Sequence, residues 1–145
     1  MTVVHAAGWY ENADITIKES DEPSGNQVAD VELQIPKEFT GRTFVVPGRR
    51  IDDLAAEHGF LNPDYVEVTV NGAEMDVLRG MPRLLAQANR ILVAGMMRDD
   101  SGTPAHLIVE PYLREAGFAT QVSKTGRTVN EQWGRVDGHV FGYRV

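Results

Sequence analysis

Apolar and polar residues alternate in two stretches of the N-terminal third, Ala13 to Lys18 and Asp30 to Ile35. An alternation with a period of two is typical of strands that bury one face. The segment from Glu19 to Gln27 between them is acidic and has no apolar residue, which is typical of an exposed loop. We therefore predict an antiparallel pair of strands with one face exposed to solvent.

Two short apolar runs predict further strands in this part of the chain. Thr2 to Ala7 forms one of them, which ends at Gly8, and Thr43 to Val46 forms the other, which Pro47-Gly48 should stop.

A short helix is predicted after the second of these runs. Asp52 is placed as its N-cap and Gly59 as its left-handed C-terminal residue.

The alternating stretch from Tyr65 to Val70 is followed by Asn71-Gly72, which fits either a hairpin turn or a strand-to-helix turn. The residues after Gly72 decide between them, because apolar side chains recur there at helical rather than alternate spacing. These residues are Val77, Leu78, Met81, Leu84, Leu85 and Ala88. We predict a strand, a tight turn and a helix broken at Gly80, with a second short helix starting at Pro82.

The remaining pattern alternates strands with helices. Ile91 to Ala94 is a continuous apolar run of the kind buried on both faces of a parallel sheet. Thr103 should cap a helix that continues to Gly117 and is kinked or restarted at Pro111. Residues 118–122 and 139–145 read as closing strands. This succession indicates a βαβ sheet in which the early antiparallel pair is an insertion.

Composition narrows the classes of function. A chain of 145 residues with 42% hydrophobic content fits a single domain over residues 1–145. The net charge of -7 and scattered basic residues disfavour a nucleic-acid partner. There is no cysteine, and the four histidines lie far apart, so no metal site is predicted. No apolar run is long enough for a membrane span, and a cytoplasmic protein is the default expectation.

The segment from Val68 to Gly80 resembles the strand-four signature of the FkbM family of S-adenosylmethionine-dependent methyltransferases. Residues 50–54 are similar to the helix start that precedes this signature in the family, and Ala6-Ala7-Gly8 is similar to the end of strand three. The resemblance implies a Rossmann-like class I methyltransferase fold with three layers, αβα, and an inserted β-hairpin. It covers the family's second half, from strand three onward, without the first two strand-helix units.

The resemblance implies a binding site for S-adenosylmethionine and catalytic residues in the turn after strand four. His5, Ala7 and Gly8 are then the candidate cofactor-binding residues, and Asn71 and Glu74 are the candidate catalytic residues. The sequence has no G-x-G-x-x-G turn between a strand and a helix. Thr69 and Asn71 stand where the family has two acids.

Each candidate also has a structural reading. Asn71 tolerates a left-handed turn, and Glu74 in a first helical turn interacts favourably with the helix dipole. His5 is equally compatible with a histidine at the rim of the core.

Two functions therefore remain open. One is O-methyl transfer to a small hydroxylated molecule or sugar, and the other is a non-catalytic interaction or oligomerisation module. In the family's order, strand one lies beside strand four. We therefore expect a homo-oligomer, or a partner chain, that covers the edge of the strand from Tyr65 to Val70.

Overall fold

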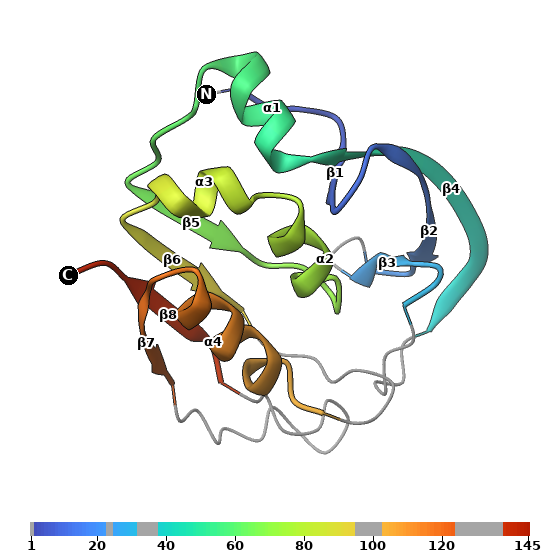
Figure 1. Cartoon of the computed structure of the whole chain (residues 1–145). Helices are drawn as coiled ribbons and strands as arrows, with labels where there is room; N and C mark the ends of the chain where they lie inside the picture. Colours follow the sequence, from blue (N-terminus) through green and yellow to red (C-terminus); the bar gives the residue numbers. More distant parts are fainter. Residues whose placement is uncertain (1, 23–24, 32–37, 95–102, 124–137) are drawn as a thin grey trace.

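The computed structural model describes residues 2–22, 25–31, 38–94, 103–123 and 138–145 (Figure 1). Within these ranges the protein is a mixed α/β structure of two four-stranded sheets and four helices. None of the helices in these ranges is long and apolar enough to span a membrane.

The first sheet, sheet A, has the strand order β1-β4-β2-β3. Its strands are β1 (Ala7–Trp9), β2 (Ala13–Ser20), β3 (Gln27–Val28) and β4 (Phe39–Arg50). β2 pairs antiparallel with β4 and with β3, and β1 runs parallel to the end of β4. The antiparallel pair expected as an insertion is thus part of a sheet of its own.

Two strand predictions in this region need correction. The apolar run 2–7 is extended strand only at its end, because β1 begins at Ala7 and Val3 is 80% exposed rather than buried. β2 pairs with β4 and with Gln27–Val28, not with the predicted segment that begins at Asp30, and Asp30 itself lies in a turn. The rest of that predicted strand, from residue 32 onward, lies outside the described residues.

β4 is longer than its sequence pattern predicts. Pro47 and Gly48 do not stop the strand, which continues to Arg50. Pro47 lies opposite Asp14 of β2. A proline is tolerated in a strand when its nitrogen faces away from the neighbouring strand, so the position of Pro47 is compatible with an intact β2–β4 ladder.

The second sheet, sheet B, has the order β5-β6-β8-β7. Its strands are β5 (Tyr65–Val68), β6 (Arg90–Val93), β7 (Ala119–Val122) and β8 (Val140–Tyr143). β5 and β6 are parallel, whereas β8 runs antiparallel to both of its neighbours. β5 therefore forms one edge of the sheet.

The helices are α1 (Ile51–His58), α2 (Glu74–Arg79), α3 (Pro82–Gln87) and α4 (His106–Glu115). Gly59 ends α1 with a φ of 75°, which confirms its predicted left-handed conformation. The predicted break is also confirmed, because α3 restarts with Pro82 at its first position. α4 begins at His106 with Ala105 at the N-cap position, so the prediction that Thr103 caps the helix is wrong. Pro111 lies within one continuous helix and does not restart it.

Gly80, at the predicted break between α2 and α3, has a φ of -78°, so its backbone is in the right-handed region. Its glycine identity has another cause, since a Cβ there would lie 2.0 Å from the carbonyl oxygen of Trp9 in β1. The Gly80 carbonyl also accepts the N–H of Asp52 at 3.0 Å. Sheet A and α1 thus both meet the helices at this peptide.

The core lies between sheet B and three helices, α2, α3 and α4, which Figure 1 shows in front of the sheet. It is built around side chains that are at most 1% exposed, namely Leu78, Met81, Leu85, Ile91, Val93, Val109, Leu113 and Val140. Burying this apolar surface supplies most of the driving force for folding.

The opposite face of sheet B is open among the described residues. Tyr65, Phe141 and Tyr143 point to that side and are 51%, 42% and 47% exposed. Leu92, on the central strand β6, is half-buried. The three-layer arrangement therefore stays a prediction, because the described helices that join the core cover one face.

Arg144, next to the C-terminal residue, connects the ends of two helices. Its guanidinium donates hydrogen bonds of 2.8 to 3.1 Å to the carbonyls of Leu85, Ala88, Ala116 and Gly117. These carbonyls belong to the C-terminal ends of α3 and α4, where helix carbonyls lack partners and the helix dipole favours a cation.

We predict that Arg144→Met lowers the free energy of unfolding by about 2–3 kcal/mol, because it leaves several partly buried carbonyls without a donor. Arg90→Met, at an exposed arginine of β6, is the matched control and should change stability by less than about 0.5 kcal/mol. Urea unfolding followed by circular dichroism measures both. Equal effects of the two substitutions would contradict the role of Arg144.

Candidate functional site

The turn between β5 and α2 carries both candidate catalytic residues. β5 ends at Val68, and Gly72 has a φ of 88°, a left-handed conformation that favours glycine. Glu74 is the first residue of α2. The turn lies at the carboxyl end of β5, and ligands of open α/β sheets bind outside the carboxyl ends of the strands.

Glu74 is a buried acid, with 3% of its surface exposed. Its Oε1 accepts the N–H of Gly72 at 3.3 Å. Burial raises the pKa of the Glu74 carboxyl to about 7, although its own backbone N–H and that of Gly72 lower it. The carboxyl therefore exchanges a proton near neutral pH, where general bases work best.

Asn71 connects the same turn to sheet A. Its Nδ2 donates a hydrogen bond of 3.1 Å to the carbonyl of Asn26, just before β3. Thr69, two residues before Asn71, donates its hydroxyl to Glu67 at 3.2 Å. The amide of Asn71 thus fixes the position of the turn against a second sheet.

The candidate cofactor residues lie on β1 and just before it. His5 is exposed, whereas Ala7 and Gly8 pair with Gly48 and Arg49 of β4. A Cβ at Gly8 would come within 2.9 Å of Ile51. Gly8 therefore serves close packing. Asn71 and Glu74 form hydrogen bonds with Asn26 and Gly72, so the structure does not show the five candidates as one cluster.

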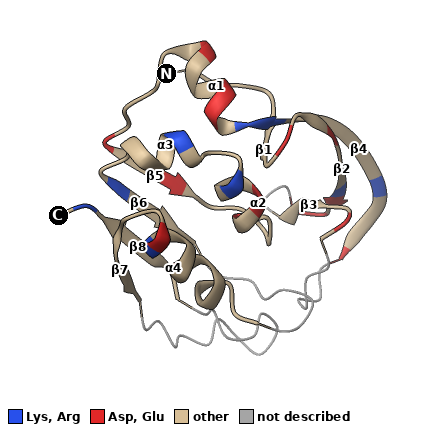
Figure 2. Cartoon of the chain, viewed as in Figure 1, with Lys and Arg blue, Asp and Glu red and all other residues tan. Residues whose placement is uncertain are grey.

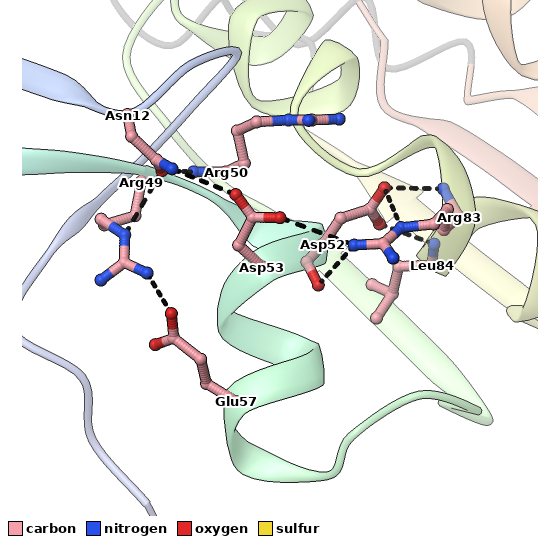
Figure 3. Close-up of polar contacts among 8 residues, drawn as sticks. All are labelled: Asn12, Arg49, Arg50, Asp52, Asp53, Glu57, Arg83 and Leu84. Carbon is pink, nitrogen blue, oxygen red and sulfur yellow. Dashed lines mark hydrogen bonds and ion pairs between the residues drawn. The ribbon is translucent and has the colours of Figure 1, made fainter.

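Asp52 has a different role from the predicted one. The residue before α1 is Arg50, and the Asp52 side chain is buried and directed toward α3 (Figure 3). Its two oxygens accept the backbone N–H groups of Arg83 at 2.9 Å and Leu84 at 2.8 Å. The N-terminal residue of α3, Met81, supplies no side-chain cap. Asp52 therefore caps α3 from another helix.

Charged residues continue this contact toward β4. The Arg83 guanidinium lies 3.4 Å from Asp52 and 3.5 Å from Asp53, and Asn12 donates to Asp53 at 3.1 Å. Arg49 pairs with Glu57. Figure 2 shows acidic and basic residues side by side where β4 runs into α1.

A groove of about 450 Å³ opens beside this network, between α1 and α3. Its lining is mixed, with apolar and polar side chains from Ala55, Leu61, Leu84 and Ala86, and from Asp52, Asn62, Arg83 and Gln87. Both oxygens of Asp52 already accept backbone N–H groups. The charged group in the groove that is left to contact a ligand is therefore the guanidinium of Arg83.

His139 and Ser123 also lie at the carboxyl edge of sheet B, although the sequence pattern did not single them out. The Ser123 hydroxyl accepts the N–H of His139 at 3.0 Å, and the Nδ1 atom of His139 is buried without a hydrogen-bond partner. Because β8 is antiparallel, the residue before it lies at the edge where the parallel strands end. Only the topology reveals this placement.

No group of three histidine, aspartate or glutamate side chains suited to a metal ion occurs in the described parts of the chain.

Comparison with protein families gives one decisive finding. The model of the methyltransferase FkbM domain matches residues 4–119. The chain belongs to this family. The family match confirms the resemblance seen in the signature from Val68 to Gly80 and indicates a methyltransferase-like function. Comparisons with curated proteins and with solved structures gave no match.

The role of Asp52 leads to a testable prediction for the FkbM domain. Asp52→Asn replaces one acceptor oxygen by an amide donor that faces a backbone N–H, and should lower the free energy of unfolding by about 2–3 kcal/mol. Asp53→Asn, the same change one residue later at a more exposed carboxylate, should cost less than about 1 kcal/mol. Urea unfolding of both variants is the measurement. Equal losses would show that the cap is not what distinguishes Asp52.

The Glu74 carboxyl predicts a pH dependence of stability. Its pKa rises from about 4.5 to about 7 on folding, so the folded state binds more protons between these pH values. The unfolding free energy therefore falls as pH rises through this window, by at most about 3 kcal/mol. Glu74→Gln, which cannot ionise, should match the wild type near pH 4, below the unfolded-state pKa, and exceed it at pH 8. Parallel stability curves for the two proteins would contradict the raised pKa.

Proposed function

We propose that the domain takes part in O-methyl transfer from S-adenosylmethionine to a small hydroxylated molecule or sugar. The observation that carries the proposal is an ionisable carboxyl with a pKa of about 7 at the carboxyl end of β5, in a chain of the FkbM family. S-adenosylmethionine supplies an electrophilic methyl group when bound. The acceptor hydroxyl must lose its proton as it attacks that group.

Glu74 is the residue we assign to that proton. A base with a pKa near the working pH is often deprotonated and still binds a proton strongly enough to remove it from the acceptor. Asn71 lies on the same turn and is assigned to orienting the acceptor through hydrogen bonds. The hydrogen bond that the Gly72 N–H donates to Glu74 holds the carboxylate at the carboxyl end of β5.

The described residues do not form a cofactor cradle by themselves. Ala7 and Gly8 are used in strand pairing and packing, and no described strand pairs with the outer edge of β5. We therefore propose that the cofactor site is completed by a further strand-helix unit that adds at β5, from elsewhere in the polypeptide or from a partner.

Two surfaces support this place of addition. The edge strand β5 offers backbone groups to a new strand, and the open face of sheet B carries the exposed Tyr65, Phe141 and Tyr143. Helices joined to the new strand would cover these aromatic side chains and produce the three-layer, Rossmann-like arrangement within a single domain.

A second candidate, a non-catalytic interaction module, is favoured by the burial of Glu74. With 3% exposure and a hydrogen bond to the turn, its carboxyl also serves as a structural staple. The two functions differ in whether the protein binds the cofactor.

Calorimetric titration of S-adenosylhomocysteine into the protein, with its assembly state measured by light scattering in the same buffer, separates the two functions. We expect a Kd at or below about 100 μM, which is about 5 kcal/mol of binding free energy. Glu74→Gln is the matched variant, and it should keep this binding and lose methyl transfer to hydroxylated acceptors. Absence of heat at millimolar ligand would overturn the enzymatic proposal and favour the interaction module.

A further inference from the structure

The groove between α1 and α3 lies away from the candidate catalytic turn. Leu61 and Asn62 of its lining precede β5, whereas Glu74 follows the opposite, carboxyl end of the same strand. Its volume of about 450 Å³ is within the range of sites that bind small molecules. A ligand bound in this groove would therefore be separate from the cofactor and the methyl acceptor of the proposed reaction.

The floor of the groove is apolar. Ala55 of α1 and Leu84 of α3 are 6% and 8% exposed, and both belong to the hydrophobic core. Leu61, from the loop after α1, and Ala86 of α3 also line the groove and are exposed to solvent. A short hydrocarbon chain that lies along these four side chains is removed from water together with them, which favours binding.

Three side chains bring hydrogen-bond donors to the same groove. Arg83 and Gln87 lie four residues apart on α3 and therefore on the same face of the helix. Asn62 lines the groove from the loop after α1. The carboxamides of Asn62 and Gln87 make no hydrogen bond within the described part of the chain. A ligand oxygen in the groove can therefore accept hydrogen bonds from more than one side chain.

The guanidinium of Arg83 is the charged group that a ligand can reach. Its side chain is 68% exposed and extends from α3 toward the start of α1 (Figure 3). Its contacts with Asp52 and Asp53 use Nε and Nη2 at 3.3 to 3.5 Å, lengths at which hydrogen bonds are weak. Nη1 makes no hydrogen bond to another described residue, so its two N–H groups are left for a ligand.

We propose that this groove binds a small monocarboxylate that carries an alkyl chain. The carboxylate accepts hydrogen bonds from Nη1 of Arg83 and from the carboxamide of Gln87, one helical turn later. The alkyl chain lies on Ala55, Leu61 and Leu84. This division matches the usual composition of small-molecule sites, in which apolar walls supply most of the contact and a few polar groups fix the orientation.

Charge decides the class of ligand. A cation would meet the positive charge of Arg83, and the Asp52 side chain is 1% exposed and already accepts two backbone N–H groups. These N–H groups also offset the charge of Asp52, so Arg83 keeps positive charge for one further anionic group. A phosphate dianion would bring two negative charges close to Asp52 and Asp53, which a single guanidinium cannot offset. Arginine pairs with a carboxylate through two parallel hydrogen bonds.

Titration of the full chain with hexanoate, followed by two-dimensional NMR, tests the site. We expect saturable binding with a Kd of about 1 mM or below, and shifts centred on the amides of Ala55, Asn62 and residues 83–87. Hexanamide, which has the same shape without the charge, and hexylammonium, which has the opposite charge, should bind at least tenfold more weakly. The proposal is overturned by a lack of saturation with hexanoate, by equal binding of hexanamide, or by displacement of hexanoate by an equal concentration of inorganic phosphate.

Two variants separate the charge of the groove from its shape. Arg83→Met removes the guanidinium and keeps a long apolar stem, so it should weaken hexanoate binding at least tenfold and leave hexanamide binding unchanged. Ala86→Phe keeps Arg83 but fills the groove, so it should abolish binding of both ligands. Arg79→Met is the matched control, because Arg79 lies outside the groove, is 60% exposed and forms a long ion pair of 3.8 Å with Asp76.

Circular dichroism verifies that each variant is folded. Unchanged hexanoate binding by the folded Ala86→Phe variant, or equal losses of binding in Arg83→Met and Arg79→Met, would contradict a site in this groove.

Discussion

The carboxylate of Asp52 is the contact on which the arrangement of the helices depends. It lies on α1 but satisfies the first free N–H groups of α3, a helix of six residues that is too short to be stable alone. At the other end of α3, Arg144 satisfies carbonyls with a positive charge. Both charges oppose the helix dipole in the favourable sense, so α3 is held at each end by a residue from a different part of the chain.

The position of α3 in turn fixes the groove beside α1 and the core over sheet B. Leu84 and Leu85 are buried next to the cap, and the start of α3 follows the break at Gly80. α2, which carries Glu74, is joined directly to this break. Asp52 and Glu74 are thus linked through a short, packed segment that runs from the start of α3 through Gly80 to α2.

Glu74 combines two opposing demands. The charged form that could accept a proton is the form that burial disfavours, and the hydrogen bond from Gly72 offsets part of that cost. A fully solvated glutamate would be charged at neutral pH but a much weaker base. The raised pKa of Glu74 therefore lowers the free energy of unfolding at neutral and higher pH, and it makes the carboxylate at the end of β5 a stronger base.

Local rules allowed much of the fold to be predicted from the sequence. The change from alternate to helical spacing after Gly72, the proline that starts α3 and the left-handed Gly59 each depend on neighbours in sequence, and the structure bears them out. Asn71 and Glu74 lie at the predicted turn, but their burial depends on which elements pack around it. The cap by Asp52 and the edge position of His139 depend on tertiary pairing, which no local pattern encodes.

The close approach at Gly80 has a consequence for how the molecule opens. Sheet A has few buried side chains of its own, chiefly Ile15 and Gln27, and it meets the helices where the Trp9 carbonyl abuts Gly80. Trp9 and Gly80 are far apart in sequence, so the contact between them must offset the entropy lost on closing a long loop. We therefore expect sheet A to detach before the core over sheet B on partial unfolding, so that its amides exchange with solvent before those of β6.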